Sequence, residues 1–113
     1  VFQLNNSGVH YRDFTSITDI VKILDKLSRK KIVKHNVFNI CANRPIFIKS
    51  LIQILKKYKS PLKIRNIPRN KADVFKTHGD NSKIVKYLNI KNFSRFEDEL
   101  KKTIDWFDTQ KSI

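Results

Sequence analysis

The sequence has no methionine, two glycines and a single cysteine. A glycine-rich dinucleotide-binding fingerprint needs three glycines in one short loop, so Gly8 and Gly79, which lie far apart, exclude that motif. Cys41 has no second cysteine to pair with, and therefore neither an internal disulfide nor a cysteine-based metal cluster can form. Because Cys41 ends an apolar run at residues 37–41, it is expected to be a small buried side chain rather than a reactive thiol.

Long apolar segments and targeting signals are also missing. The chain begins at Val1, and its first stretch is neither a charged and then apolar signal sequence nor a membrane span. We therefore expect a cytoplasmic protein without membrane association, and the start at Val1 is typical of a chain cut from a longer one. His10, His35 and His78 lack the i, i+4 spacing of a zinc pair, so no metal site is predicted.

Acidic residues are scarce, since 10 Asp and Glu stand against 24 Lys and Arg and give a formal net charge of +14. Such an excess attracts polyanions, so a small basic module for nucleic acid or another polyanion is one hypothesis. However, 18 of the 24 cations are lysine, whereas recognition of bases and phosphates favours arginine. Because the lysines are scattered from Lys22 to Lys111, solvated faces are the favoured interpretation and nucleic-acid binding is kept as the alternative.

The residues that are present suffice for one packed domain. The 113 residues are 40% hydrophobic and 11% aromatic, which allows a single modest core over residues 1–113. Periodicity and turn residues predict strands at 9–17, 37–41 and 62–67, helices at 18–27, 48–55, 80–88 and 94–107, and a polar loop at 69–79. This alternation is typical of an α/β fold with a few short strands and about four helices. So few strands cannot complete a doubly wound sheet, so the larger half of the core is expected to be missing.

Capping residues and apolar faces refine the predicted helices. Thr18 is the predicted N-cap of the first helix, and Asp80 that of the third. Ser94 and Glu97 have the spacing of a capping box at the start of the last helix. Two apolar faces, one on the first helix and one on the last, are predicted to be buried: Ile20, Val21, Ile23, Leu24 and Leu27, and Phe96, Leu100, Ile104 and Phe107.

Four segments, taken in order, resemble the carboxyl-terminal third of the extended short-chain dehydrogenase/reductase (SDR) family, in particular its NAD-dependent epimerases and dehydratases. They are Tyr11-Arg12-Asp13-Phe14-Thr15 before an apolar helix, Phe38-Asn39-Ile40 with Arg44-Pro45-Ile46, Asp73-Val74 through Lys83, and Phe96 to Phe107. The third segment is most similar to UDP-glucuronate 4-epimerases. The resemblance implies an incomplete extended-SDR fold, in which residues 1–113 form the carboxyl-terminal substrate-binding portion.

The resemblance also implies the activity of a longer parent protein. Such a parent interconverts UDP-sugars, as UDP-glucuronate or UDP-glucose 4-epimerases do, with NAD held by an amino-terminal part that also forms a homodimer interface. The family places its catalytic Tyr-x-x-x-Lys pair upstream of every matching segment, so the same spacing at Tyr87 and Lys91 is interpreted as coincidence. We therefore expect these residues to supply one wall of the UDP-sugar pocket, to bind no cofactor and to be inactive alone.

The Arg-Asp-Phe segment supplies two candidate substrate-binding residues. Arg12, placed by a strand, can offer the fork of its guanidinium to a diphosphate. The resemblance assigns Arg12 that role, with Phe14 beside it. The alternative for Arg12 is a surface salt bridge with Asp13 or another neighbour.

The 69–79 loop and the turn before the second helix supply the remaining candidates. By resemblance, Asp73 accepts hydrogen bonds from the two ribose hydroxyls, and Arg69 stands one residue before the position of a diphosphate-binding arginine. The alternative for Arg69 is an ordinary exposed loop cation. Arg44 and Thr77 are assigned to the pocket lining, with Arg44 on the uridine side. The hypothesis requires Arg12 and Asp73 to converge on the same cleft.

Overall fold

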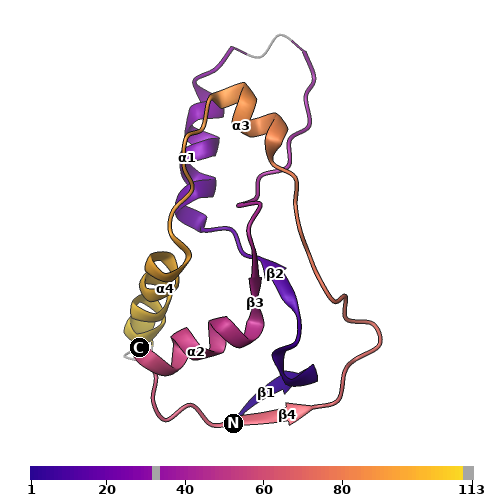
Figure 1. Cartoon of the computed structure of the whole chain (residues 1–113). Coiled ribbons are helices and arrows are strands. Elements are labelled where there is room, and N and C mark those ends of the chain that lie inside the picture. Colours follow the sequence, from indigo (N-terminus) through magenta and orange to yellow (C-terminus); the bar gives the residue numbers. More distant parts are fainter. Residues whose placement is uncertain (32–33, 111–113) are drawn as a thin grey trace. The chain divides into compact units, whose positions relative to one another are not determined.

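The computed structural model describes residues 1–31 and 34–110, and it divides into two compact units. The first unit contains Val1–Arg12 and Pro45–His78, and the second contains Asp13–Arg44 and Gly79–Ile113. Figure 1 shows the helices and strands of both units, labelled in chain order. The described residues form four α-helices and a few short strands, which confirms the predicted mixed α/β class.

The first unit contains a parallel pair of strands. β1 (Phe2–Asn5) lies beside β4 (Ile64–Ile67), with Asn5 opposite Ile67 at the end of the pair (Figure 1). Because the strands are parallel, their carboxyl ends lie at the same edge of the pair. This edge is where the loop at residues 68–72 begins.

Between β1 and β4, the first unit also contains a short helix, a second strand pair and α2. η1 (Asn6–Gly8) follows β1 directly, and Gly8 has a φ of +75°, a conformation that favours glycine. β2 (Tyr11–Asp13) pairs with β3 (Pro45–Phe47), and α2 (Ile48–Tyr58) follows β3 directly. Neither β1 nor β3 was predicted, because segments this short show no clear alternation of apolar and polar residues.

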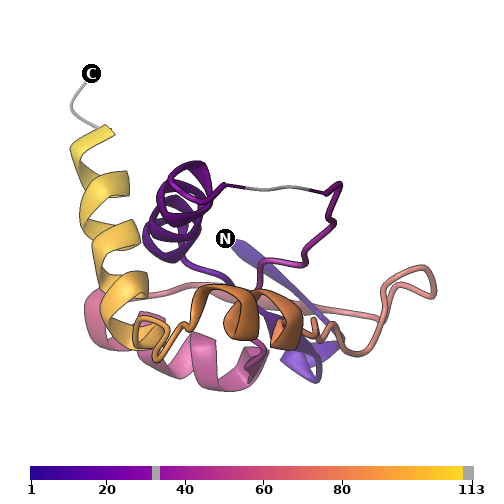
Figure 2. The same ribbon diagram turned by 90° about the horizontal axis from the view of Figure 1, so that it is seen from above.

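Three helices make up most of the regular structure of the second unit: α1 (Ile17–Ser28), α3 (Ser82–Leu88) and α4 (Phe96–Gln110). Ile84 of α3 is fully buried and Ile23 of α1 is 4% exposed. In Figures 1 and 2, α4 begins beside the first turn of α1. All four predicted helices are therefore present, with shifts of a few residues at their ends.

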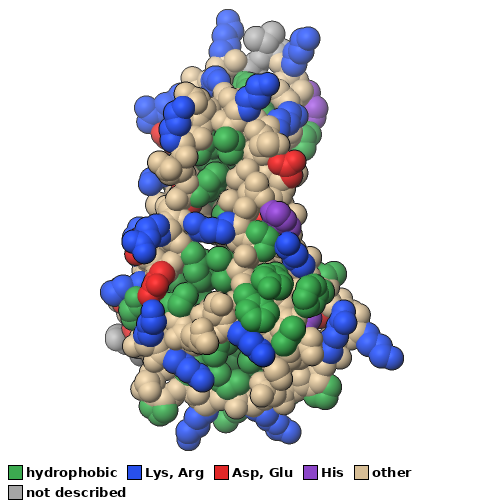
Figure 3. Space-filling view, in the orientation of Figure 1, with side chains coloured by type: hydrophobic (Ala, Val, Ile, Leu, Met, Phe, Trp, Pro, Cys, Tyr) green, Lys and Arg blue, Asp and Glu red, His purple; other side chains and the backbone are tan. Residues whose placement is uncertain are grey.

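Cationic side chains are spread over the surface. In the space-filling view, blue Lys and Arg side chains lie over all parts of the visible face, with few red acidic ones between them (Figure 3). They form no continuous basic stripe on this face. Among the described residues, no helix combines the length and the apolar character that crossing a membrane would require.

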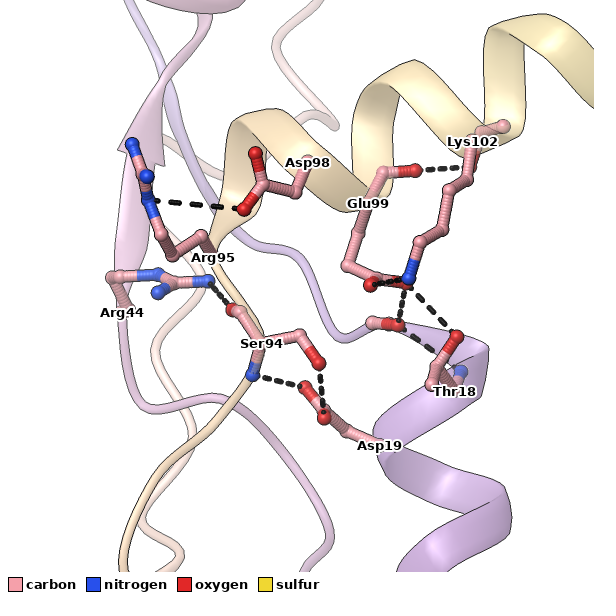
Figure 4. Close-up of polar contacts among 10 residues, drawn as sticks. Thr18, Asp19, Arg44, Ser94, Arg95, Asp98, Glu99 and Lys102 are labelled. Carbon is pink, nitrogen blue, oxygen red and sulfur yellow. Dashed lines mark hydrogen bonds and ion pairs between the residues drawn. The ribbon is translucent and has the colours of Figure 1, made fainter.

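Side-chain hydrogen bonds join α1 to the start of α4 (Figure 4). The hydroxyls of Ser16 and Thr18 both donate to Oε2 of Glu99, at 2.7 and 2.9 Å. Asp19 accepts two hydrogen bonds from Ser94, one from the backbone N–H at 3.0 Å and one from the hydroxyl at 2.7 Å. These contacts connect segments that are more than 70 residues apart in the sequence.

The helix caps differ in part from the predicted ones. Ser16 caps α1, because its hydroxyl accepts the N–H of Thr18 at 3.0 Å, so the assignment to Thr18 was wrong. Asp80 lies just before the N-cap of α3 and accepts the N–H of Ser82 at 2.9 Å. Ser94 uses its hydroxyl to bind Asp19 instead of forming the predicted capping box.

Residues 37–41, predicted as a buried strand, form no strand in the structure. A strand needs a hydrogen-bonded neighbour, and none lies beside this segment in the part of the chain that the structure describes. Side chains bind its carbonyls instead: Lys83 Nζ donates to Val37 at 2.8 Å, and Asn81 Nδ2 donates to Cys41 at 2.8 Å. Val37 is accordingly 68% exposed.

The predicted core faces of the first and last helices are only partly buried. Ile23 of α1 is 4% exposed, whereas Val21 and Leu24 are 57% and 51% exposed. α4 has no buried residue over its described length, and Phe107 is 54% exposed. Periodicity identifies the apolar side of a helix, but burial requires another element to pack there. The described residues cover these two faces only in part.

Gly79 lies so close to Cys41 that a side chain does not fit. A Cβ at position 79 would lie 2.4 Å from Sγ of Cys41 and 3.0 Å from its Cβ. We expect Gly79→Ala to lower the free energy of unfolding by about 1–3 kcal/mol, as overpacking usually does. Denaturant unfolding followed by circular dichroism measures this. The double variant Gly79→Ala with Cys41→Ala should recover part of the loss, and equal stability of Gly79→Ala and the unaltered chain would contradict the prediction.

Glu99 is expected to make the second unit sensitive to acid. Hydrogen bonds from Lys102 and Ser16 are the main causes that lower the pKa of Glu99 from 4.5 to about 2. Because the folded state binds this proton less tightly than the unfolded state, the stabilisation is complete above pH 4.5 and is lost as the pH falls towards about 2. Glu99→Gln should therefore lose less stability than the unaltered chain over that range.

Urea unfolding at a series of pH values measures this difference. Asp105→Asn is the matched control, because Asp105 also accepts from a lysine on α4, Lys101 at 2.8 Å, but the pair is exposed. It should keep the pH dependence of the unaltered chain. A Glu99→Gln variant with that same pH dependence would rule out the assigned role of Glu99.

Candidate functional site

Arg12 and Asp73 form an ion pair in the first unit. Nη2 of Arg12 donates to Oδ1 of Asp73 at 2.5 Å, and the two side chains are 25% and 32% exposed. Nη1 of Arg12 also donates to the carbonyl of Tyr11 at 2.7 Å. Both terminal nitrogens of the guanidinium are therefore hydrogen-bonded. The two residues that the sequence hypothesis places in one cleft therefore converge and are in direct contact. The partner of Arg12 is Asp73 and not the adjacent Asp13.

Backbone pairing brings these two residues together. The segment at residues 73–77 runs alongside β2, where the N–H of Tyr11 donates to the carbonyl of Phe75 at 2.9 Å. The N–H of Thr77 then donates to the carbonyl of Tyr11 at 3.2 Å. The loop that leads into this segment starts at the carboxyl end of β4, and ligand sites often form at the carboxyl ends of parallel strands.

Asn5 is a third member of this group, which we call the Arg12–Asp73–Asn5 cluster. Its Nδ2 donates to Oδ2 of Asp73 at 2.6 Å, and its Oδ1 accepts the N–H of Asn70 at 3.0 Å. Sequence reasoning missed Asn5. The signal at this position was the turn composition of residues 5–8, which predicts a chain reversal but no partner 68 residues away.

The cluster retains hydrogen-bonding capacity for a ligand. An arginine has five N–H donors, of which the contacts to Asp73 and Tyr11 use two. A carboxylate has about four acceptor positions, and Arg12 and Asn5 occupy two of them at Asp73. The remaining donors suit an anion, and the remaining acceptors suit neighbouring hydroxyl groups.

Arg69 and Thr77 lie in the same unit as the cluster. Arg69 is exposed in the loop after β4. Thr77 is also exposed, and its backbone is held by the carbonyl of Tyr11. The assignment of Arg69 to the diphosphate and of Thr77 to the pocket lining stays a prediction.

Phe14 and Arg44 belong to the second unit. Phe14 is 37% exposed, and its ring centroid lies 5.6 Å from that of Phe96. Arg44 donates from Nη2 to the carbonyl of Ser94 at 3.0 Å (Figure 4), and its backbone N–H donates to Oδ1 of Asp13 at 3.1 Å. Both residues are thus engaged within their own unit, and their roles as lining residues stay predictions.

The described residues do not fit a dinucleotide. Gly8 forms a turn, and Gly79 packs against Cys41 at a distance that excludes even a Cβ. Neither glycine therefore opens the backbone to a pyrophosphate. Residues 1–31 and 34–110 also contain no group of three or more His, Cys, Asp or Glu side chains that could hold a metal ion.

Tyr87, whose spacing to Lys91 matches a catalytic pair, has packing contacts in the second unit. Its ring lies 4.9 Å from that of Phe38, and Nζ of Lys30 lies 4.1 Å from its centroid. The carbonyl of Tyr87 also accepts from Lys30 at 2.6 Å. These contacts assign Tyr87 to packing within the second unit, and the interpretation of its spacing to Lys91 as coincidence stays a prediction.

No protein-family model matches the chain. It is 32% identical over 108 residues to an uncharacterized protein of Methanocaldococcus jannaschii, an alignment that covers 93% of this chain and 32% of that protein. It is 33% identical over 101 residues to a UDP-glucuronate 4-epimerase of Thermodesulfobacterium geofontis, covering 88% of this chain and 31% of that enzyme. The chain therefore spans about a third of the length of the curated relatives that it matches.

The fold is shared with solved sugar-nucleotide enzymes. A UDP-glucose 4-epimerase from Thermotoga maritima, solved with UDP-glucose, matches with a TM-score of 0.82 and 24% identity over 96% of this chain and 35% of that one. Other structural neighbours include an NAD-dependent dehydratase and a protein solved with UDP-glucuronic acid and NAD. The relatives and the fold together place the chain, as predicted, in the NAD-dependent epimerase/dehydratase family of extended SDRs, where it corresponds to the carboxyl-terminal part.

Proposed function

We propose that this chain contributes one wall of the sugar-nucleotide pocket of an NAD-dependent UDP-sugar 4-epimerase of the UDP-glucuronate or UDP-glucose type. The observation that carries the proposal is the convergence of Arg12 and Asp73 at the edge of the parallel strand pair. Relatives named as UDP-glucuronate 4-epimerases support the substrate class. The fold match to an epimerase solved with UDP-glucose is consistent with it.

The two charged groups of the cluster suit different parts of a UDP-sugar. The N–H groups of Arg12 that Asp73 and Tyr11 do not use donate to oxygens of the diphosphate. The remaining acceptor positions of Asp73 receive the ribose hydroxyls, and Arg69 is a second cation for the diphosphate. Thr77 in this unit is a further proposed lining residue.

The chemistry of epimerisation would come from polypeptide outside these residues. The described residues do not fit NAD, which supplies the reversible oxidation of the sugar in such a reaction. We propose that NAD and the catalytic Tyr-x-x-x-Lys pair are held by an amino-terminal part of a longer parent, which also forms the homodimer. This chain alone would then show no epimerase activity.

Titration of UDP into the 113-residue chain tests the binding proposal. UDP should shift the NMR signals of residues around Arg12 and Asp73. Arg12→Ala should weaken UDP binding by about 10–100-fold, because it removes charge-assisted hydrogen bonds worth roughly 1.5–3 kcal/mol. Arg12→Lys keeps the charge but loses the planar fork, so its affinity should fall between those of Arg12→Ala and the unaltered chain. Calorimetry or NMR titration measures all three dissociation constants.

Arg29→Ala is the matched control for this experiment. Arg29 also pairs with an aspartate, Asp25 at 3.1 Å, but the pair lies on the exposed surface of α1. Its replacement should leave the affinity for UDP unchanged. An equal loss in Arg12→Ala and Arg29→Ala would mean that general charge attraction, and not the cluster, binds the nucleotide.

The net charge of +14 supports one second candidate, a surface for nucleic acid or another polyanion. Binding of that kind weakens steeply with salt and does not depend on the nucleoside. Fluorescence anisotropy with a labelled oligonucleotide at two salt concentrations, beside titrations of UDP and inorganic diphosphate, separates the two candidates. UDP binding that is tighter than diphosphate binding, and that weakens less steeply with salt than oligonucleotide binding does, is the outcome expected here. Salt-sensitive oligonucleotide binding without UDP binding would favour the polyanion surface.

A further inference from the structure

Asn5 links the end of β1 to the loop that follows β4. Its backbone is fixed by the parallel register, in which it lies opposite Ile67. Its half-buried side chain therefore reaches the loop from a paired strand. A polar group on a paired strand is held in a defined orientation more firmly than one on a free loop.

The loop that Asn5 contacts is a tight turn at residues 70–73. The N–H of Ala72 donates to Oδ1 of Asn70 at 3.0 Å, and the N–H of Asp73 donates to the carbonyl of Asn70 at 3.1 Å. Asn5 holds this turn at both ends, since it accepts from the N–H of Asn70 and donates to the carboxylate of Asp73. The turn thus has both internal hydrogen bonds and a connection to β1.

Asparagine suits this position because its side chain is both a donor and an acceptor. Nδ2 donates to Asp73 at 2.6 Å while Oδ1 accepts from Asn70 at 3.0 Å. Alanine would provide neither hydrogen bond. An ionised aspartate would still accept from Asn70, but it could not donate to Asp73.

Asn5 also determines how Asp73 meets Arg12. Oδ1 of Asp73 accepts from Arg12, and Oδ2 accepts from Asn5. A carboxylate without such a second partner tends to form two parallel hydrogen bonds with a guanidinium, which would occupy a further N–H of the arginine. The orientation of Asp73 therefore affects how many donors Arg12 can offer to a ligand.

We propose that Asn5 is a positioning residue for the sugar-nucleotide site. By retaining Oδ2 of Asp73, it keeps the Arg12–Asp73 ion pair to a single contact and leaves N–H groups of Arg12 for the diphosphate. Asn5 itself acts through Asp73 and need not touch the ligand. This inference rests on the proposed function, and it adds a residue that determines the affinity of the same site.

Titration of UDP into Asn5→Ala tests the inference. The variant should remain folded by circular dichroism and bind UDP about tenfold more weakly, because Asp73 turns towards Arg12 and takes up its donors. Asn66→Ala is the matched control, since Asn66 is an exposed asparagine on β4 of the same strand pair. The control should bind UDP as the unaltered chain does. Unchanged UDP affinity in a folded Asn5→Ala overturns the proposal.

Asn5→Asp provides a readout that a purely structural role would not change. It places a second carboxylate at hydrogen-bond distance from Asp73, where Arg12 is the facing cation, so at neutral pH it should bind UDP more weakly than Asn5→Ala does. As the pH falls, the two carboxylates share one proton and the donor is restored. Affinity relative to the unaltered chain should then recover for Asn5→Asp but not for Asn5→Ala. If the ratio of the UDP affinity of Asn5→Asp to that of the unaltered chain does not depend on pH, the proposal is overturned.

The ligand-free chain separates this inference from the proposed function. If the unaltered chain binds no UDP, the proposed function fails, but the role of Asn5 is still measured by the NMR signals of the Arg12 side-chain N–H groups. In Asn5→Ala, a further N–H of Arg12 should become hydrogen-bonded to Asp73. Unchanged Arg12 signals in that variant would show that Asn5 does not control the ion pair.

Discussion

The candidate site depends on the parallel pairing of β1 with β4. This pairing brings the carboxyl ends of two strands to one edge, so that Asn5 lies beside the loop leading to Asp73. An ion pair between two partly exposed side chains contributes only about 0–1 kcal/mol by itself. The contact between Arg12 and Asp73 therefore matters less as a source of stability than as an arrangement of donors and acceptors. Its geometry is set by the strands and by Asn5.

Two buried polar side chains connect distant segments within the second unit. Asp19 and Asn81 are buried there, at 7% and 6% exposure, and both make hydrogen bonds to segments distant in sequence. A buried polar group is stable only when it is paired, so these contacts restrict which segments can meet. Exposed apolar residues on α1, such as Val21 and Leu24, show that the described residues do not use all the apolar surface that the sequence provides.

The sequence predicted the helices more accurately than the strands, for a physical reason. α1 and α2 have apolar residues at helical spacing, and helical hydrogen bonds form within the segment itself. Strands need a partner, so the apolar run at residues 37–41 was wrongly predicted, whereas the short β1 was missed and forms because β4 pairs with it. In the site, resemblance singled out Arg12 and Asp73, but no local pattern pointed to Asn5.

The order of residue types along the chain determined the α/β class, the family and the exclusion of a dinucleotide fingerprint. These properties depend on local spacing and on motifs that can be read along the chain. Only the tertiary structure decided that Asp73 and not Asp13 is the partner of Arg12, that Asn5 holds the other carboxylate oxygen, and that much of the apolar face of α1 is exposed. Strand register and packing join residues more than 60 positions apart, and hydrogen bonds of that range are set by which backbones pair in space.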